Sequence, residues 1–155
     1  MVHAAEHAGD CLQQLNVVRS AGGTLRGIHV HARYAEQYFP LVGRMFFVFK
    51  DARRAMASYG NEISFWVEGG AEVKIDVPAG VAHGVYFAES STLAYGLSSV
   101  WNNKSEYGCR WNDPAIGVAW PVHEPVLSDR DAAAGTFEEM VEGLHSSPEM
   151  IAARS

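Results

Sequence analysis

Cysteine and charged residues are scarce in this chain of 155 residues. The two cysteines, Cys11 and Cys109, stand far apart in sequence, which excludes a disulfide framework and a Cys-x-x-Cys metal site. Charged residues make up 19% of the chain, the net charge is −6, and no basic cluster is present. Nucleic acid is therefore excluded as an expected partner.

Long hydrophobic runs are missing as well. No apolar stretch approaches the ~20 residues that a membrane helix requires. The strongest one, MFFVF, is flanked by Arg44 and Lys50. The first residues, MVHAAEHAGD, lack the positive start and apolar core of a secretory signal. We therefore expect a cytoplasmic protein that has no membrane partner.

Hydrophobic residues account for 48% of the chain, which suits one domain with a buried core. Between about residues 12 and 111, short runs rich in Val, Ile, Phe and Thr alternate with turn residues. The expected strands are LNVV, TLRGIHVH, VGRMFFVFK, EISFWV, EVKIDV, GVYFA and TLAYGLSSV. Many short strands at such spacing favour an antiparallel β-sandwich or barrel.

After Pro125 the pattern changes to helix formers. One helical stripe collects the apolar residues Phe137, Met140, Val141 and Leu144. Thr136 and Glu139 have the spacing of a capping box, which predicts the helix start. We expect an N-terminal segment over 1–11, a β-barrel over 12–127, and a short C-terminal helix with its tail over 128–155.

Polar side chains gather on one face of the expected strand LRGIHVH. Under strict alternation His29 and His31 share that face. A bulge at Gly27 would turn Arg26 toward the same side. The ring nitrogens of two histidines would lack hydrogen-bond partners in a purely apolar core, so we expect both residues in a polar pocket.

Two segments are similar to the paired motifs of the cupin superfamily of small β-barrels. The first covers residues 23–43 and carries His29, His31 and Glu36, and the second is PAGVAH, which ends at His83. This resemblance implies a mainly β fold, a cupin-type antiparallel β-barrel or jelly roll. In such barrels polar side chains meet in an apolar pocket.

Five motifs in chain order resemble the dTDP-4-dehydrorhamnose 3,5-epimerase family. They are LRGIH, PAGVAHG, LAY, WNDPAIGVAWP and LSDRDA, and the similarity runs from about Gln14 to Asp131. Members have a cupin fold, usually form dimers, and invert carbons flanking the ketone of a nucleotide-linked 4-keto-6-deoxy sugar. The resemblance thus implies a homodimeric nucleotide-sugar epimerase with no cofactor.

The same resemblance implies catalytic roles for three residues. His29 would be the base, Asp131 would hold its other ring nitrogen, and Tyr95 would be the acid. Inverting a carbon beside a ketone requires a base on one face and a proton donor on the other. A carboxylate on the far nitrogen fixes the histidine tautomer. The expected substrate contacts are Arg26 at a phosphate or oxyanion, Gln14 and Asn16 at the nucleotide base, His83 at the sugar, and Trp101 by stacking.

A metal centre is the alternative interpretation. His31 stands where the family has glutamine, and the segment that carries the family's lysine contains Glu36 instead. His29, His31, Glu36 and His83 have the spacing of the three-His, one-Glu cupin site, which suits Mn, Fe, Ni or Zn. The protein would then be a metal-dependent isomerase or oxygenase. The two interpretations conflict, because a ring nitrogen of His29 that binds metal is no longer available as the base.

Structural roles compete with these chemical ones. Asp131 lies three residues after Ser128 and has the position of the acidic arm of a capping box. Tyr95 is also explained as a core tyrosine, His83 as a hydrogen-bonded structural histidine, and Glu36 as a solvated loop residue. A third functional possibility is a non-catalytic barrel that binds sugar nucleotides. We expect the remaining histidines on the surface: His3, His7, His123 and His145.

Overall fold

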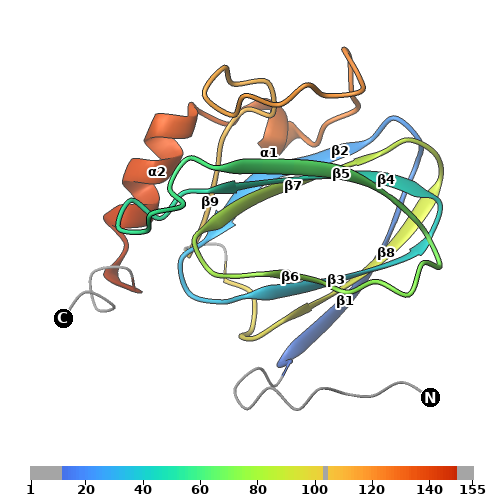
Figure 1. Cartoon of the computed structure of the whole chain (residues 1–155), viewed down its shortest axis with the longest axis horizontal. Coiled ribbons are helices and arrows are strands. Elements are labelled where there is room, and N and C mark those ends of the chain that lie inside the picture. The colour runs from blue at the N-terminus through green and yellow to red at the C-terminus, as the bar shows by residue number, and fades with distance from the viewer. Residues whose placement is uncertain (1–11, 103–104, 150–155) are drawn as a thin grey trace.

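The computed structural model describes residues 12–102 and 105–149 (Figure 1). The predicted N-terminal segment, 1–11, and the end of the predicted tail, 150–155, lie outside them. Within the described residues the elements are β1 (Gln14–Ser20), β2 (Leu25–His31), β3 (Glu36–Val42), β4 (Arg44–Asp51), β5 (Glu62–Glu68), β6 (Ile75–Val77), β7 (Val81–Phe87), β8 (Ser91–Leu97), β9 (Glu106–Gly108), α1 (Asp129–Ala132) and α2 (Phe137–His145).

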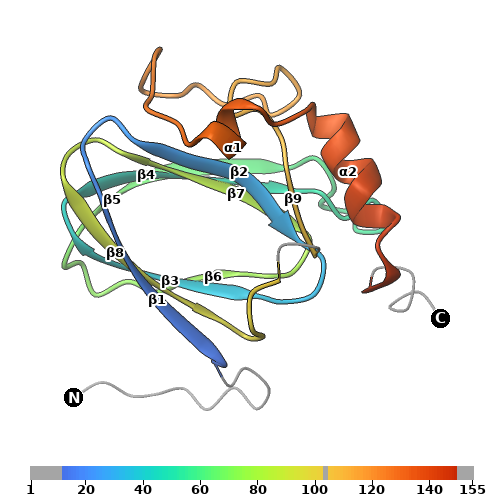
Figure 2. The same cartoon turned by 180° about the vertical axis from the view of Figure 1, so that it is seen from behind.

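The strands form two antiparallel sheets that face each other, as both views show (Figures 1 and 2). One sheet has the order β1-β8-β3-β6 and the other the order β5-β4-β7-β2-β9. Strands that follow each other in the chain, such as β2 and β3, lie in different sheets, so the chain repeatedly crosses between layers. This arrangement confirms the predicted cupin-type β fold.

Strand β4 explains the strongest apolar run of the sequence. Phe47 and Phe49 point between the sheets into one apolar cluster, whereas Phe46 and Val48 point to the outer face into another. The outer cluster is covered by the apolar stripe of α2: Phe137, Met140, Val141 and Leu144. Both faces of β4 are thus buried, which is why its sequence does not alternate with polar residues.

Helix α2 begins with the predicted capping box. The Glu139 backbone N–H donates to the Thr136 hydroxyl at 3.2 Å, and the Thr136 N–H donates to the Glu139 carboxylate at 2.7 Å. A second helix, the single turn α1, precedes α2, and its N-cap is Ser128, where the capping-box alternative for Asp131 implied a helix start. None of the helices within the described residues is both long and apolar enough to pass through a lipid bilayer.

The prediction of a surface position was wrong for His145. This residue is 9% exposed, and its Nε2 lies 2.9 Å from the Ala52 carbonyl oxygen. It stands eight residues after Phe137, so it continues the i, i+3, i+4, i+7 stripe that faces the barrel. His123 is exposed as expected, whereas His3 and His7 lie outside the described residues.

Strand β3 was not among the predicted strands, and it contains Pro40, a residue that is disfavoured in an interior strand. The structure accommodates it at a place where the sheet is incomplete. β6 pairs only with Glu36, Gln37 and Tyr38, so Pro40 lies beyond that pairing. On the other side, the register with β8 shifts immediately after Pro40. The strand is therefore regular where it carries Glu36 and irregular where it carries the proline.

Cys109 lies in the outer apolar cluster together with α2. Its side chain is fully buried, and the thiol is free. Burial, reinforced by the nearby charge of Asp113, raises the pKa of this thiol to about 12. The group is therefore a neutral, apolar part of the core.

Asp51, at the end of β4, stabilises the fold in a pH-dependent way. Its carboxylate accepts from Arg53 Nε at 2.9 Å and from the Ser58 hydroxyl at 2.6 Å. The Arg53 hydrogen bond outweighs burial and lowers the pKa of Asp51 from 3.8 to about 2. Since the folded state has the lower pKa, this stabilisation is complete above the unfolded pKa and is lost as pH falls through about 2.

We expect Asp51→Asn to lower the free energy of unfolding by about 1–2 kcal/mol at pH 7 and by about half as much at pH 3. Urea unfolding at the two pH values measures both differences. Asp76→Asn is the matched control, because Asp76 pairs with Lys74 on the exposed surface, where such pairs contribute little. An Asp51→Asn difference that stays constant with pH would contradict the assignment.

Candidate active site

A pocket of about 440 Å³ opens between the two sheets. Strands β2 and β7 supply one wall, β3 and β8 supply the other, and residues of α1 and of the segment before it complete the lining. Most of the residues predicted from the sequence line this pocket: Arg26, His29, His31, Glu36, His83, Tyr95, Trp101 and Asp131.

His29 and Asp131 meet although 102 residues separate them in the chain. His29 Nε2 lies 2.7 Å from Asp131 Oδ1. The backbone N–H of Asp131 donates to the Ser128 hydroxyl at 3.1 Å, so the backbone takes part in the helix cap while the carboxylate faces the imidazole. Burial opposes ionisation of Asp131, but the hydrogen bond and charge of His29 prevail and lower its pKa. The buried carboxylate is thus suited to orient His29.

The local irregularity of β2 lies at Gly27. Pairing with β7 shifts register between Gly27 and His29, where a bulge was predicted. Gly27 has φ +118°, and a Cβ there would lie 2.7 Å from the Cα of Gly84, so only glycine fits. Next to it, Arg26 lines the pocket and donates from Nε to the Ser20 hydroxyl at 3.1 Å.

Tyr95 reaches the pocket from β8, in the sheet opposite to that of His29. Its ring meets that of Tyr38 edge to face, with centroids 5.9 Å apart. Burial, together with the negative charge of Glu36, raises the pKa of Tyr95. The phenol therefore keeps its proton at neutral pH and has a proton to donate.

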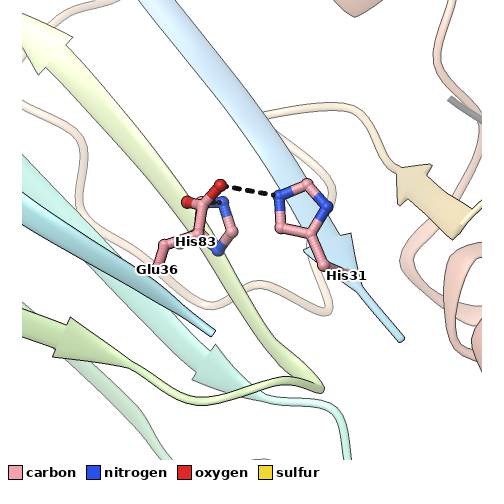
Figure 3. Close-up of side chains that lie close together, drawn as sticks. All are labelled: His31, Glu36 and His83. Carbon is pink, nitrogen blue, oxygen red and sulfur yellow. Dashed lines mark ion pairs between the residues drawn. The ribbon is translucent and has the colours of Figure 1, made fainter. Parts of the chain in front are cut away.

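A second polar cluster consists of His31, Glu36 and His83 (Figure 3). Glu36 Oε1 lies 3.1 Å from His31 Nε2, and Glu36 Oε2 lies 3.2 Å from His83 Nε2. The Tyr38 hydroxyl donates to the same carboxylate. Glu36 is 4% exposed, so it is not a solvated loop residue.

Burial and charge act in opposite directions on this cluster. Burial disfavours the ionised form of Glu36, but the charge of His83 and the contacts with His31 lower its pKa to about 2. Burial also lowers the pKa of His83, to about 4. The cluster thus places one buried carboxylate between two imidazoles, a donor set that a metal ion accepts. The three donors lie within 4.8 Å of one another, and His29, paired with Asp131, is not one of them.

Glu106 on β9 belongs to the site and was missed in the sequence. Its oxygens lie 3.8 Å from His29 Nδ1 and 3.9 Å from His31 Nδ1. The Trp101 indole N–H donates to it at 2.5 Å, and the guanidinium of Arg130 pairs with it. β9 spans three residues, too short for any alternation pattern, so only the fold brings Glu106 to the pocket.

Gln14 and Asn16 lie on β1, near the pocket mouth rather than in its lining. The Gln14 amide donates to Asn16 Oδ1 at 3.0 Å, and its oxygen accepts from the Trp101 backbone N–H at 2.9 Å. Trp101 is 47% exposed at the same mouth. Gln14 therefore contacts the segment that carries the predicted stacking residue.

Comparison with known proteins gives a consistent result. The model of the family described as dTDP-4-dehydrorhamnose 3,5-epimerase matches residues 2–139. The enzyme of that name from Pseudomonas aeruginosa is 32% identical over 130 residues, which cover 81% of this chain and 72% of the relative. The enzyme from Mycobacterium tuberculosis is 33% identical over 143 residues, 88% of this chain and 70% of the relative.

Solved structures agree with the sequence comparison. The rmlC epimerase of Mycobacterium tuberculosis has a TM-score of 0.82 at 33% identity, covering 89% of this chain and 72% of the other. The epimerase of Legionella pneumophila in complex with dTDP-4-keto-L-rhamnose has a TM-score of 0.80 at 29% identity, covering 87% and 74%. ChmJ, a 3'-monoepimerase of Streptomyces bikiniensis in complex with dTDP-quinovose, has a TM-score of 0.77 at 30% identity, covering 86% and 69%. The chain therefore belongs to the dTDP-4-dehydrorhamnose 3,5-epimerase family.

Proposed function

We propose that this protein inverts a carbon next to the C4 ketone of a nucleotide-linked 4-keto-deoxysugar. The observation that carries the proposal is the His29–Asp131 pair, at 2.7 Å, in one pocket with the Tyr95 phenol of the opposite sheet. The substrate class is supported by the family and by relatives whose structures contain dTDP-linked sugars.

His29 acts as the base in this proposal. We assign the Nε2 proton to the hydrogen bond with Asp131, which leaves the lone pair on Nδ1. Nδ1 takes the proton from the carbon beside the ketone, and the electron pair of the broken C–H bond moves onto the ketone oxygen as an enolate. The imidazolium that forms is stabilised by Asp131 and by Glu106, whose oxygen lies 3.8 Å from Nδ1.

Tyr95 completes the inversion. Its hydroxyl gives a proton to the same carbon from the opposite face, and the enolate collapses to the ketone. The phenolate then takes a proton from water and the imidazolium of His29 loses its proton to water, which restores both groups. The raised pKa of Tyr95 keeps the proton on this group until the enolate accepts it. Donation from across the pocket, rather than from His29, is what changes the configuration.

The remaining predicted residues have binding roles in the proposal. The Arg26 guanidinium, at the pocket wall, binds an anionic oxygen of the substrate. Trp101 stacks on the sugar or the nucleotide at the mouth, and Gln14 and Asn16 contact the nucleotide base beside it. His83 lines the sugar end of the pocket. Homodimer formation and a cytoplasmic location stay predictions of the family resemblance.

Solvent exchange tests the function directly. Incubation of the protein in D₂O with a dTDP-linked 4-keto-6-deoxyhexose is expected to introduce deuterium at a carbon beside the ketone, which NMR and mass spectrometry detect. The same nucleotide sugar without a ketone is the matched control and takes up no deuterium. Saturable binding without deuterium uptake would contradict the proposal and favour the non-catalytic sugar-nucleotide-binding barrel.

A further inference from the structure

We infer that His31, Glu36 and His83 bind one divalent first-row transition-metal ion at a site separate from the His29–Asp131 pair. The inference goes beyond the proposed epimerase chemistry, which uses none of these three side chains as its acid or base. It rests on the arrangement of their donor atoms and on the buried Nδ1 of His31, which has no hydrogen-bond partner within the described residues.

The donor atoms lie close to the separations that one ion imposes. The nitrogens of His31 and His83 are 3.1 and 3.2 Å from the oxygens of Glu36, and all three donors lie within 4.8 Å of one another (Figure 3). Two ligands held about 2.1 Å from a common ion are about 3.0–4.2 Å apart. A small closure of buried side chains is therefore enough to form the site.

The orientation of His83 suits a metal ligand. Its Nδ1 lies 3.1 Å from the carbonyl oxygen of Val81, an acceptor, so Nδ1 carries the ring proton. Nε2, on the other side of the ring, lies 3.2 Å from the Glu36 carboxylate, so one ion between them contacts both groups. Metal-bound histidines typically donate their other N–H to a backbone carbonyl in this way.

His31 supports the same conclusion from a different contact. Its buried Nδ1 has no hydrogen-bond partner within the described part of the chain. The nearest carboxylate oxygen is that of Glu106, at 3.9 Å. When Nε2 binds an ion, Nδ1 carries the proton and faces this acceptor, the usual orienting partner of a metal-bound histidine. The Tyr34 ring, stacked at 4.4 Å, holds the imidazole in plane.

His29 is excluded from the ligand set because its Nε2 is held by Asp131 at 2.7 Å. The four-residue site predicted from the sequence is thereby divided into a three-ligand metal site and an acid–base pair. The conflict between the two interpretations disappears, since the base is not a ligand. Because all three ligands line the pocket, a divalent ion held there would act as a Lewis acid toward an oxygen of the bound sugar.

Titration of the chelator-treated, tag-free full chain with Co²⁺ tests the inference. The wild type is expected to bind close to one equivalent, with visible absorption bands and a raised melting temperature. Glu36→Gln and His31→Gln are expected to weaken Co²⁺ binding by about 100-fold or more. His29→Asn is the matched control and is expected to change the affinity by less than about threefold, because it replaces a neighbouring histidine that is not a ligand.

Three results would overturn the inference. Wild-type binding of less than about 0.1 equivalent excludes the site. Undiminished binding in folded Glu36→Gln or His31→Gln protein means that the ion binds elsewhere. If His29→Asn loses as much Co²⁺ affinity as the other two variants, then His29 is also a ligand and the four-residue site is correct. Circular dichroism identifies any variant that fails to fold, and His31→Gln then decides in place of Glu36→Gln. Because the readout is metal content, a protein without epimerase activity still gives a clear answer.

Discussion

The variant His29→Asn is expected to take up deuterium about 10³-fold more slowly than the wild type. Asparagine keeps the size and a hydrogen bond to Asp131 but has no basic nitrogen, so no group removes the proton beside the ketone. The measurement is the initial rate of deuterium uptake into the dTDP-linked 4-keto-6-deoxyhexose. Binding of the nucleotide sugar, followed by calorimetry, is expected to change little.

Two further variants make the His29 result specific. His123→Asn is the matched control, since His123 is an exposed histidine outside the pocket lining, and its rate is expected to equal that of the wild type. Asp131→Asn is expected to lower the rate of deuterium uptake by about 10²-fold or more, because it removes the carboxylate that fixes the tautomer of His29. If His29→Asn stayed within about tenfold of the wild-type rate, the assigned base would be wrong.

Tyr95→Phe is expected to separate exchange from inversion. The base still removes the proton, and the enolate is reprotonated by His29 on the original face, so deuterium enters with retained configuration. Formation of the inverted sugar falls by about 10²-fold or more, because the donor on the opposite face is lost. NMR coupling constants of the product distinguish the two configurations while mass spectrometry follows the deuterium.

Tyr59→Phe is the control for removing a phenolic hydroxyl, since Tyr59 lies on the exposed surface away from the pocket. Equal formation of inverted product by Tyr95→Phe and the wild type would show that another group donates the second proton. Parallel loss of exchange and inversion would also contradict the assignment, because Tyr95 would then be needed for the step ascribed to His29.

The fold was predictable where the sequence pattern depends on local rules. Strand alternation, turn residues and the Thr136–Glu139 capping box all follow from neighbouring residues, and each expected element of this kind is present. β3 was not predictable in this way, because the tolerance for Pro40 depends on how far the neighbouring strand β6 extends. His145 was misplaced because the helical stripe continues one position further than the apolar residues do.

The residues of the site that lie in recognisable sequence motifs were predictable. The Arg-Gly-Ile-His and Leu-Ser-Asp-Arg-Asp segments brought His29 and Asp131 into one hypothesis, and the fold puts them 2.7 Å apart. Glu106 has no such signal, since it becomes part of the pocket only through the pairing of β9 with β2. The separation of His29 from the other three predicted metal ligands was also not predictable. Sequence spacing does not show that His29 Nε2 is already held by Asp131.

The fully buried thiol of Cys109 makes it possible to compare local opening of the structure between the wild type and each variant. Thiolates are the form that reacts with alkylating reagents, and burial suppresses both ionisation and access at this position. Labelling at Cys109 thus requires the α2 helix to separate from the outer face of the barrel. The labelling rate of Cys109 therefore reports how readily α2 separates from the barrel, on the face opposite to the pocket.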